Sequence, residues 1–150
     1  MTANAEIWLE ASVATLSDCA SMFEADNLEV LDISVQLPAY TGGAYISVVG
    51  AEQSVELGVV CTPEAQQVLA QRFLGAEAAL ERDEVADAMR EIANIVAGGL
   101  KTVMIQHDPS LLLGLPLFID GVHLGANTRT HAAKVNLIGQ ELWLVVIVRG

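Results

Sequence analysis

Positively charged residues are scarce in this chain of 150 residues. Seven Lys and Arg stand against 19 Asp and Glu, which gives a net charge of −12. A surface with this excess of negative charge repels nucleic acid and anionic lipid, and it disfavours direct capture of a free phosphorylated metabolite. The glycine-rich motifs that cradle phosphate, GxxxxGK[S/T] and GxGxxG, are also missing. If the protein takes part in phosphate chemistry, we expect another molecule to supply the cations.

Cysteine, histidine and aromatic residues are also few. The two cysteines, Cys19 and Cys61, favour a reduced, cytoplasmic protein in which both thiols lie in the core, and a catalytic thiol is the less favoured alternative. His107, His123 and His131 share no helix face and form no zinc-ligand spacing, so we expect no metal site. An aromatic content of 5% provides no stacking platform for nucleic-acid bases.

Long apolar runs are absent. The longest, 111–119 and 142–148, are much shorter than the roughly 20 residues that span a bilayer. Residues 1–10 lack the basic start and apolar stretch of a secretory signal. Hydrophobic residues still make up 53% of the chain, enough for a substantial core. We therefore expect a folded, cytoplasmic protein with a single domain over 1–150.

Hydrophobic periodicity predicts an alternation of helices and strands that is not a strict βαβ repeat. Helical spacing is found in 5–24, 63–74 and 84–106. Strand patterns are found in 30–37, 44–50, 54–61, 115–119, 122–125, 133–138 and 141–148. Tight turns are predicted at Asp120-Gly121 and Gly139-Gln140. This order predicts an α/β chain of the α+β kind, an antiparallel-rich sheet with long helices packed on one face.

The segment 84–106 predicts a helix with two different faces. Six apolar residues at helical spacing predict a stripe that faces the core: Val85, Met89, Ile92, Val96, Leu100 and Val103. Five residues fall on the opposite side and are called the outer stripe: Asp87, Glu91, Asn94, Gly98 and Lys101. Gly costs about 1 kcal/mol relative to Ala inside a helix, and Asn is also unfavourable there. The outer stripe therefore indicates a surface on which a partner docks, the alternative being a solvated helix face with a chance Asn.

The spacing Glu-x-x-Asn is a weak motif by itself. Glu24 and Asn27 also match it, but they lie where the first helix is expected to end. The copy formed by Glu91 and Asn94 lies in the middle of a helix, opposite the core stripe. Gly98 follows one turn later and removes a side chain where a partner could approach. These surroundings favour the second copy as a functional site.

Residues 91–101, EIANIVAGGLK, resemble the signature helix of the CheC/CheX/FliY chemotaxis phosphatases, most closely the CheX branch. The family pattern is Asp or Ser, three residues, Glu, two residues, Asn, and then Pro after about 22 more, and Asp87, Glu91 and Asn94 fit it. Pro116 follows one position early, with residues 95–115 in between. The flanking segments TPEAQQVLAQRFLG and LGLPLFIDG resemble the helix before the signature and the strand after it.

The resemblance implies one active site per chain and a homodimer. Members with two sites repeat the signature on the N-terminal helix, but here Glu10 is followed three positions later by Val13, and Glu6 by Leu9. CheX-like proteins have a single site and are homodimers. The same arrangement is therefore expected for this chain.

The resemblance also implies an activity, hydrolysis of the aspartyl phosphate on a CheY-type response-regulator receiver domain in two-component signalling. Asn94 would orient the attacking water, and Glu91 would pair with a Lys of the receiver. Asp87, Gly98 and Lys101 would form the docking surface. The receiver would hold the Mg²⁺ ion, and this chain would bind no cofactor.

Two other functions stay open on the sequence alone. The domain could bind a phosphorylated receiver without hydrolysing it, as an adaptor, since fold likeness does not guarantee activity. It could also bind a small molecule on the open face of the sheet, although no residue pattern points to a ligand. The intact set of Asp87, Glu91 and Asn94 favours the phosphatase.

Overall fold

A computed structural model describes residues 2–33, 36–51, 54–121 and 128–149. In this part of the chain the helical elements are α1 (Thr2–Asp18), the 3₁₀ helix η1 (Ala20–Phe23), α2 (Pro63–Leu74) and α3 (Arg82–Met104). The strands are β1 (Glu29–Ile33), β2 (Gly43–Val49), β3 (Ser54–Val60), β4 (Leu112–Leu113), β5 (Leu117–Ile119), β6 (Thr128–Leu137) and β7 (Gln140–Arg149). The order matches the prediction of one helix, three strands, two helices and then further strands.

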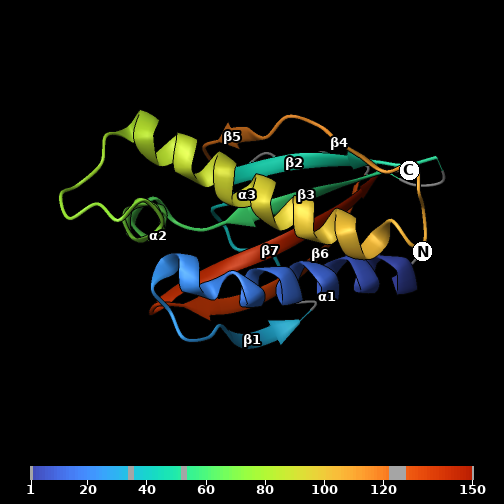
Figure 1. Cartoon of the computed structure of the whole chain (residues 1–150), viewed down its shortest axis with the longest axis horizontal. Coiled ribbons are helices and arrows are strands. Elements are labelled where there is room, and N and C mark those ends of the chain that lie inside the picture. The colour runs from blue at the N-terminus through green and yellow to red at the C-terminus, as the bar shows by residue number, and fades with distance from the viewer. Residues whose placement is uncertain (1, 34–35, 52–53, 122–127, 150) are drawn as a thin grey trace.

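The strands form one seven-stranded sheet in the order β1-β6-β7-β3-β2-β4, with β5 also pairing with β2. Every pairing is antiparallel. Figure 1 shows α1 and α3 side by side across one face of this sheet, with α2 at one end. The predicted α+β fold, an antiparallel sheet with long helices on one face, is confirmed.

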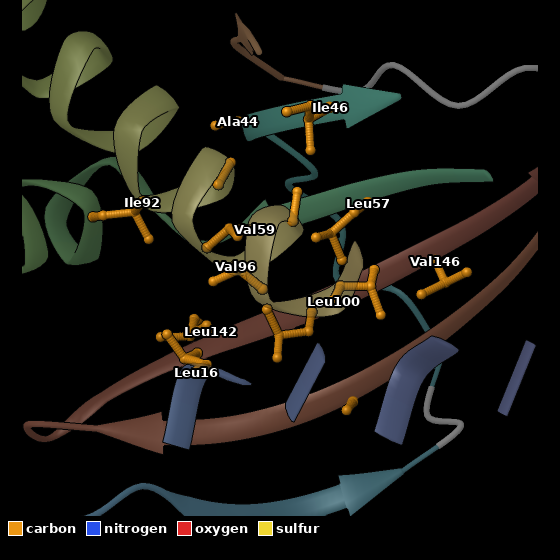
Figure 2. Close-up of a cluster of buried hydrophobic side chains, with 14 of the residues drawn as sticks. Leu16, Ala44, Ile46, Leu57, Val59, Ile92, Val96, Leu100, Leu142 and Val146 are labelled. Atoms are coloured by element: carbon orange, nitrogen blue, oxygen red, sulfur yellow. The ribbon is translucent and has the colours of Figure 1, made fainter. Parts of the chain in front are cut away.

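The main core fills the space between the helices and the sheet. In Figure 2, Ile92, Val96 and Leu100 of α3 extend toward the side chains of the sheet, among them Leu57 and Val146. All five of these residues are at most 3% exposed. Burial of this much apolar surface, at roughly 25 cal/mol per Å², is the main force that fixes α3 on the sheet.

One residue of the predicted core stripe, Val103, is wrong, and the first helix differs in detail from its simple periodicity. Val103 is 47% exposed because it lies in the last turn of α3, one residue before the helix ends. Ile7 is 40% exposed, and the neighbouring Trp8, at 3%, is buried instead. The first helix is also interrupted: α1 ends at Asp18, and η1 then buries Ala20 and Phe23.

Strand β7 lies in the middle of the sheet, between β3 and β6. Leu144 and Val146 point into the main core, whereas Val145 and Ile147 join a second cluster around Tyr45 on the other face of the sheet. The apolar run 142–148 is thus explained by burial on both faces of the sheet.

The second cluster is held by a close contact between Tyr45 and Gly58. A Cβ added to Gly58 would lie 2.7 Å from the Tyr45 ring, so only glycine leaves room for the aromatic side chain. The Tyr45 hydroxyl donates a hydrogen bond to the carbonyl of Thr41 at 2.5 Å. Burial raises the pKa of Tyr45 to about 12. This face therefore carries a packed apolar centre.

One predicted turn is displaced by a residue. Leu137 pairs with Gln140, so the two turn residues are Ile138 and Gly139 and not Gly139 and Gln140. Their φ values are 50° and 78°, the left-handed pair of a type I′ hairpin, which places the glycine second. At the other predicted turn, β5 ends just before Asp120, and the expected strand 122–125 lies outside the described residues.

The α2 helix follows the predicted boundaries. The Thr62 hydroxyl accepts a hydrogen bond from the Ala65 backbone, Pro63 occupies the first turn, and Gly75 ends the helix with φ 66°. Within the described part of the chain, none of the helices is long and apolar enough to cross a membrane.

Candidate functional site

The α3 helix begins two residues earlier than predicted because Glu81 caps it. The Glu81 side chain accepts a hydrogen bond from the third residue of the helix, and the Glu84 side chain accepts one from the Glu81 backbone at 3.0 Å. This capping box satisfies backbone N–H groups that the helix itself leaves unpaired. The acidic residues of the first turn, Asp83 and Glu84, also suit the positive end of the helix dipole.

Close packing against α1 holds the C-terminal half of α3 at Gly99. A Cβ added to Gly99 would lie 2.2 Å from Cγ2 of Thr15, so the glycine lets the two helices approach. The Thr15 hydroxyl donates to the Ala11 carbonyl at 2.8 Å, which holds its side chain in place. Sequence reasoning missed this role of Gly99, because the helix pattern did not indicate which of the two adjacent glycines meets a neighbour.

The predicted outer stripe lies on the face of α3 that points away from the core. Asp87, Glu91 and Asn94 are exposed, and Gly98 and Lys101 are partly buried. A Cβ added to Gly98 would meet no atom within 4 Å, so the space above it is open. Gly98 and Gly99 therefore do different things: one clears the surface, and the other allows a helix contact.

Glu91 and Asn94 have no hydrogen-bond or ion-pair partner among the residues described. Asp87 differs, because Arg90 makes an ion pair with it one turn along the helix. This contact leaves the Asp87 side chain 73% exposed. The carboxylate of Glu91 and the amide of Asn94, three residues apart on one helix face, are thus presented to a partner with their polar groups unused.

A second group of side chains, the Arg82 cluster, ties the start of α3 to the end of β5. The Arg82 guanidinium donates to Asp120 at 2.5 Å and lies 4.9 Å from the centre of the Phe118 ring. The Tyr40 hydroxyl donates to the same Asp120 oxygen at 3.1 Å. The hydrogen bond from Arg82 lowers the pKa of the Asp120 carboxyl. Sequence reasoning saw Asp120 only as a turn residue.

The described residues offer no set of three or more His, Cys, Asp or Glu side chains that could hold a metal ion. The outer stripe brings only two carboxylates, Asp87 and Glu91, and Asp87 is paired with Arg90. An arrangement of this kind is suited to binding a partner and positioning a small molecule such as water, rather than to chelating a cation.

The comparison with protein families places this helix in a known group. Residues 43–138 match the model of the family described as chemotaxis phosphatase CheX. The chain belongs to the CheX family. The matched region includes the outer stripe and Pro116 and excludes α1, and it confirms the family resemblance on which the site assignment was based.

Solved structures show the same fold at low sequence identity. The chemotaxis protein CheX of Vibrio vulnificus has a TM-score of 0.77 and 15% identity, covering 95% of this chain and 99% of that one. A CheC-like chemotactic protein of Shewanella oneidensis has a TM-score of 0.75 and 20% identity, covering 99% of this chain and 100% of that one. A chain of the CheX–CheY–BeF₃–Mg²⁺ complex of Borrelia burgdorferi has a TM-score of 0.72 and 18% identity, covering 97% of this chain and 97% of that one. No curated protein matches the sequence.

Proposed function

We propose that this protein hydrolyses the aspartyl phosphate of a CheY-type receiver domain. The observation that carries the proposal is the free pair of Glu91 and Asn94 on the outward face of α3, in a chain of the CheX family. A structurally similar CheX from Borrelia burgdorferi was solved in complex with CheY, BeF₃ and Mg²⁺. That complex is the basis for assigning a receiver domain as the partner here.

The reaction suits an acidic protein without a nucleophile in the site. Phosphoryl transfer depends mainly on positioning and on neutralising charge. The receiver would supply Mg²⁺ and a Lys, the cations that a chain with net charge −12 lacks. Asn94 would place its amide beside the phosphoryl group and orient a water for in-line attack. The benefit is orientational, so a neutral amide is sufficient.

Glu91 would set the register of the complex by pairing with the Lys of the receiver. It precedes Asn94 by three residues on the same face, so one docking event would engage both side chains. Asp87 would support docking one turn earlier, and its pairing with Arg90 holds its carboxylate in place. The open surface at Gly98, with Lys101 beyond it, would admit the receiver backbone.

We also propose a homodimer formed through the β1 edge of the sheet. Strand β1 pairs only with β6 among the described strands, and Val30, Leu31 and Ile33 are 45%, 40% and 43% exposed. An edge strand with apolar side chains is a template for pairing with another chain. The opposite edge is less suitable, because Pro116 interrupts it and has no N–H to donate.

The activity is tested by following dephosphorylation of purified, phosphorylated receiver domains from the same organism with and without the protein. We expect acceleration of at least one receiver above its own rate of hydrolysis. Binding to a phosphorylated receiver without acceleration would instead make the protein an adaptor. Absence of both binding and acceleration across all receivers would refute the proposal.

A further inference from the structure

An apolar crevice opens where the end of α1, η1, α2 and α3 meet. Its walls include Cys19, Met22, Phe23, Phe73, Ile92 and Ile95. Its volume is about 10 Å³, roughly the space of one water-sized probe, so it can take the end of one small side-chain group. No polar side-chain group lines it except the Cys19 thiol.

The crevice adjoins the outer stripe directly. Ile95 follows Glu91 by one helical turn, so their Cβ atoms are neighbours about 5–6 Å apart. Ile95 is also the residue after Asn94, and it is only partly buried. A partner that covers Glu91 and Asn94 would therefore lie beside Ile95, which forms one wall of the crevice.

The two sides of the crevice differ in stiffness. The rings of Phe23 and Phe73 pack against each other with their centroids 5.9 Å apart, and they form a fixed wall. The Arg72 guanidinium donates to the Phe23 carbonyl at 3.3 Å, which links α2 to η1. Met22, in contrast, is 37% exposed, and an unbranched thioether side chain adapts readily to a neighbour.

The outer stripe alone is a poor source of binding energy. Its five residues are charged, polar or glycine. Only the Glu91 pair is expected to contribute more than the roughly 0–1 kcal/mol of an exposed charge pair. Protein interfaces gain most of their affinity from a few apolar anchors that fill pockets near the centre, with polar residues around them. The apolar crevice is the surface beside the stripe that can provide such an anchor point.

We propose that the crevice binds an apolar side chain of the phosphorylated receiver domain, next to the residues that act on the phosphoryl group. This inference rests on the proposed function and adds the determinant of affinity. The outer stripe would set the register of the complex and the chemistry, while Met22, Ile95 and the two phenylalanines would enclose the anchor. The partner would then be selected by the presence of an apolar side chain beside its phosphorylation site.

Cys19 provides a direct probe of the crevice. It is partly exposed there, whereas Cys61 is fully buried. Burial raises the pKa of both thiols, that of Cys61 to about 12, so the exposure of Cys19 is the main difference between them. Iodoacetamide should therefore modify Cys19 selectively in the folded protein. The experiment measures its alkylation rate by mass spectrometry, for the free protein and for the protein saturated with a receiver that it dephosphorylates, held active by beryllofluoride and Mg²⁺.

We expect the receiver to slow alkylation of Cys19 by about tenfold or more, because an anchor side chain excludes the reagent. Unchanged alkylation in a saturated complex would overturn the proposal and leave the phosphatase activity standing. Failure of every activated receiver to bind would overturn both. Protection of Cys19 in the free protein that is lost on dilution would assign the crevice to a second copy and contradict the proposal.

Substitutions give an independent test. Met22→Asp should raise the Kd for the activated receiver about tenfold or more and leave the rate at saturating protein close to wild type. The matched control is Leu115→Asp, at an apolar residue that is 86% exposed between β4 and β5. Its Kd should stay at the wild-type value. Circular dichroism and thermal unfolding check that both variants are folded, and equal Kd values for the two would contradict the proposal.

Discussion

At the scale of single residues, the polar side chains of the site differ in whether they already have a hydrogen-bond or ion-pair partner. Asp87 is held by Arg90, and Asp120 is held by Arg82 and Tyr40. Glu91 and Asn94 have no such partner within the described residues. The two side chains assigned to docking and catalysis are thus the ones whose hydrogen-bonding capacity is left for another molecule.

Glu91→Ala should weaken binding of the activated receiver and lower the rate of dephosphorylation. A charge pair with Lys in a partly desolvated interface is worth about 1–3 kcal/mol, so the Kd should rise about 5- to 150-fold. The measurement is a double-mutant cycle with the receiver Lys changed to Ala. The matched control is Glu10→Ala. Glu10 is an exposed residue of α1 with no Asn three positions later. Additive effects of the two changes would contradict direct pairing.

Buried groups predict a loss of stability at high pH. The pKa of Tyr45 is raised from 10 to about 12, so the fold favours the neutral phenol. Its contribution to stability is complete below about pH 10 and is lost as the pH rises toward 12. Between about pH 10 and 11, the unfolding free energy of Tyr45→Phe should fall less than that of wild type. Denaturant unfolding at each pH measures the unfolding free energy of both proteins. Equal losses in wild type and Tyr45→Phe would contradict the raised pKa of Tyr45.

At the scale of elements, the features set by local sequence signals could be predicted better than those that depend on long-range contacts. The limits of α2 could be predicted because Thr62, Pro63 and Gly75 act within one turn of each end. The division of the first helix into α1 and η1 could not be predicted, because Ala20 and Phe23 continue the helical spacing of the apolar residues across the break. The hairpin turn was misplaced by one residue because Ile138 adopts a positive φ that β-branched residues rarely show.

The same difference holds for the candidate site. The outer stripe could be predicted because helical spacing alone decides which residues share a face. The Arg82 cluster could not, because Arg82 and Asp120 are 38 positions apart and meet only through the sheet. The apolar crevice was missed for the same reason, since its walls come from four elements.

The adjacent glycines of α3 give a matched pair of tests. Gly98→Ala should raise the unfolding free energy by up to about 1 kcal/mol, because alanine favours a helix and the space is open. Gly99→Ala should lower it by about 1–3 kcal/mol, because the new methyl group meets Thr15. Denaturant unfolding measures both values. Adding Thr15→Ala to Gly99→Ala should restore most of the loss, and equal effects of the two single substitutions would contradict the packing.

At the scale of the whole molecule, the fold separates the surface proposed to bind the receiver from the sheet edge proposed to form the dimer. The helix layer presents the outer stripe and the apolar crevice, and the sheet ends in two edges to either side of it (Figure 1). A dimer through the β1 edge would extend the sheet and leave the outward face of α3 accessible. Each subunit could then act on a receiver of its own.

Leu31→Lys should convert the dimer to monomers, because it places a charge in the middle of the paired edge. Light scattering after size-exclusion chromatography measures the mass. The matched control, Leu115→Lys at the opposite edge, should remain dimeric. A monomeric wild-type protein, or a control that dissociates, would contradict the proposed interface.

The substitution Asn94→Ala decides whether Asn94 acts on the water or on docking. The measurement compares its Kd for the beryllofluoride-activated receiver with its rate of dephosphorylation at saturating protein. Asn27→Ala is the matched control, since Asn27 also follows a Glu by three residues but lies outside the outer stripe. If Asn94 orients the water, the Kd of Asn94→Ala should stay within about threefold of wild type, and its rate of dephosphorylation should fall about 10²-fold or more. Full acceleration by Asn94→Ala would contradict this role.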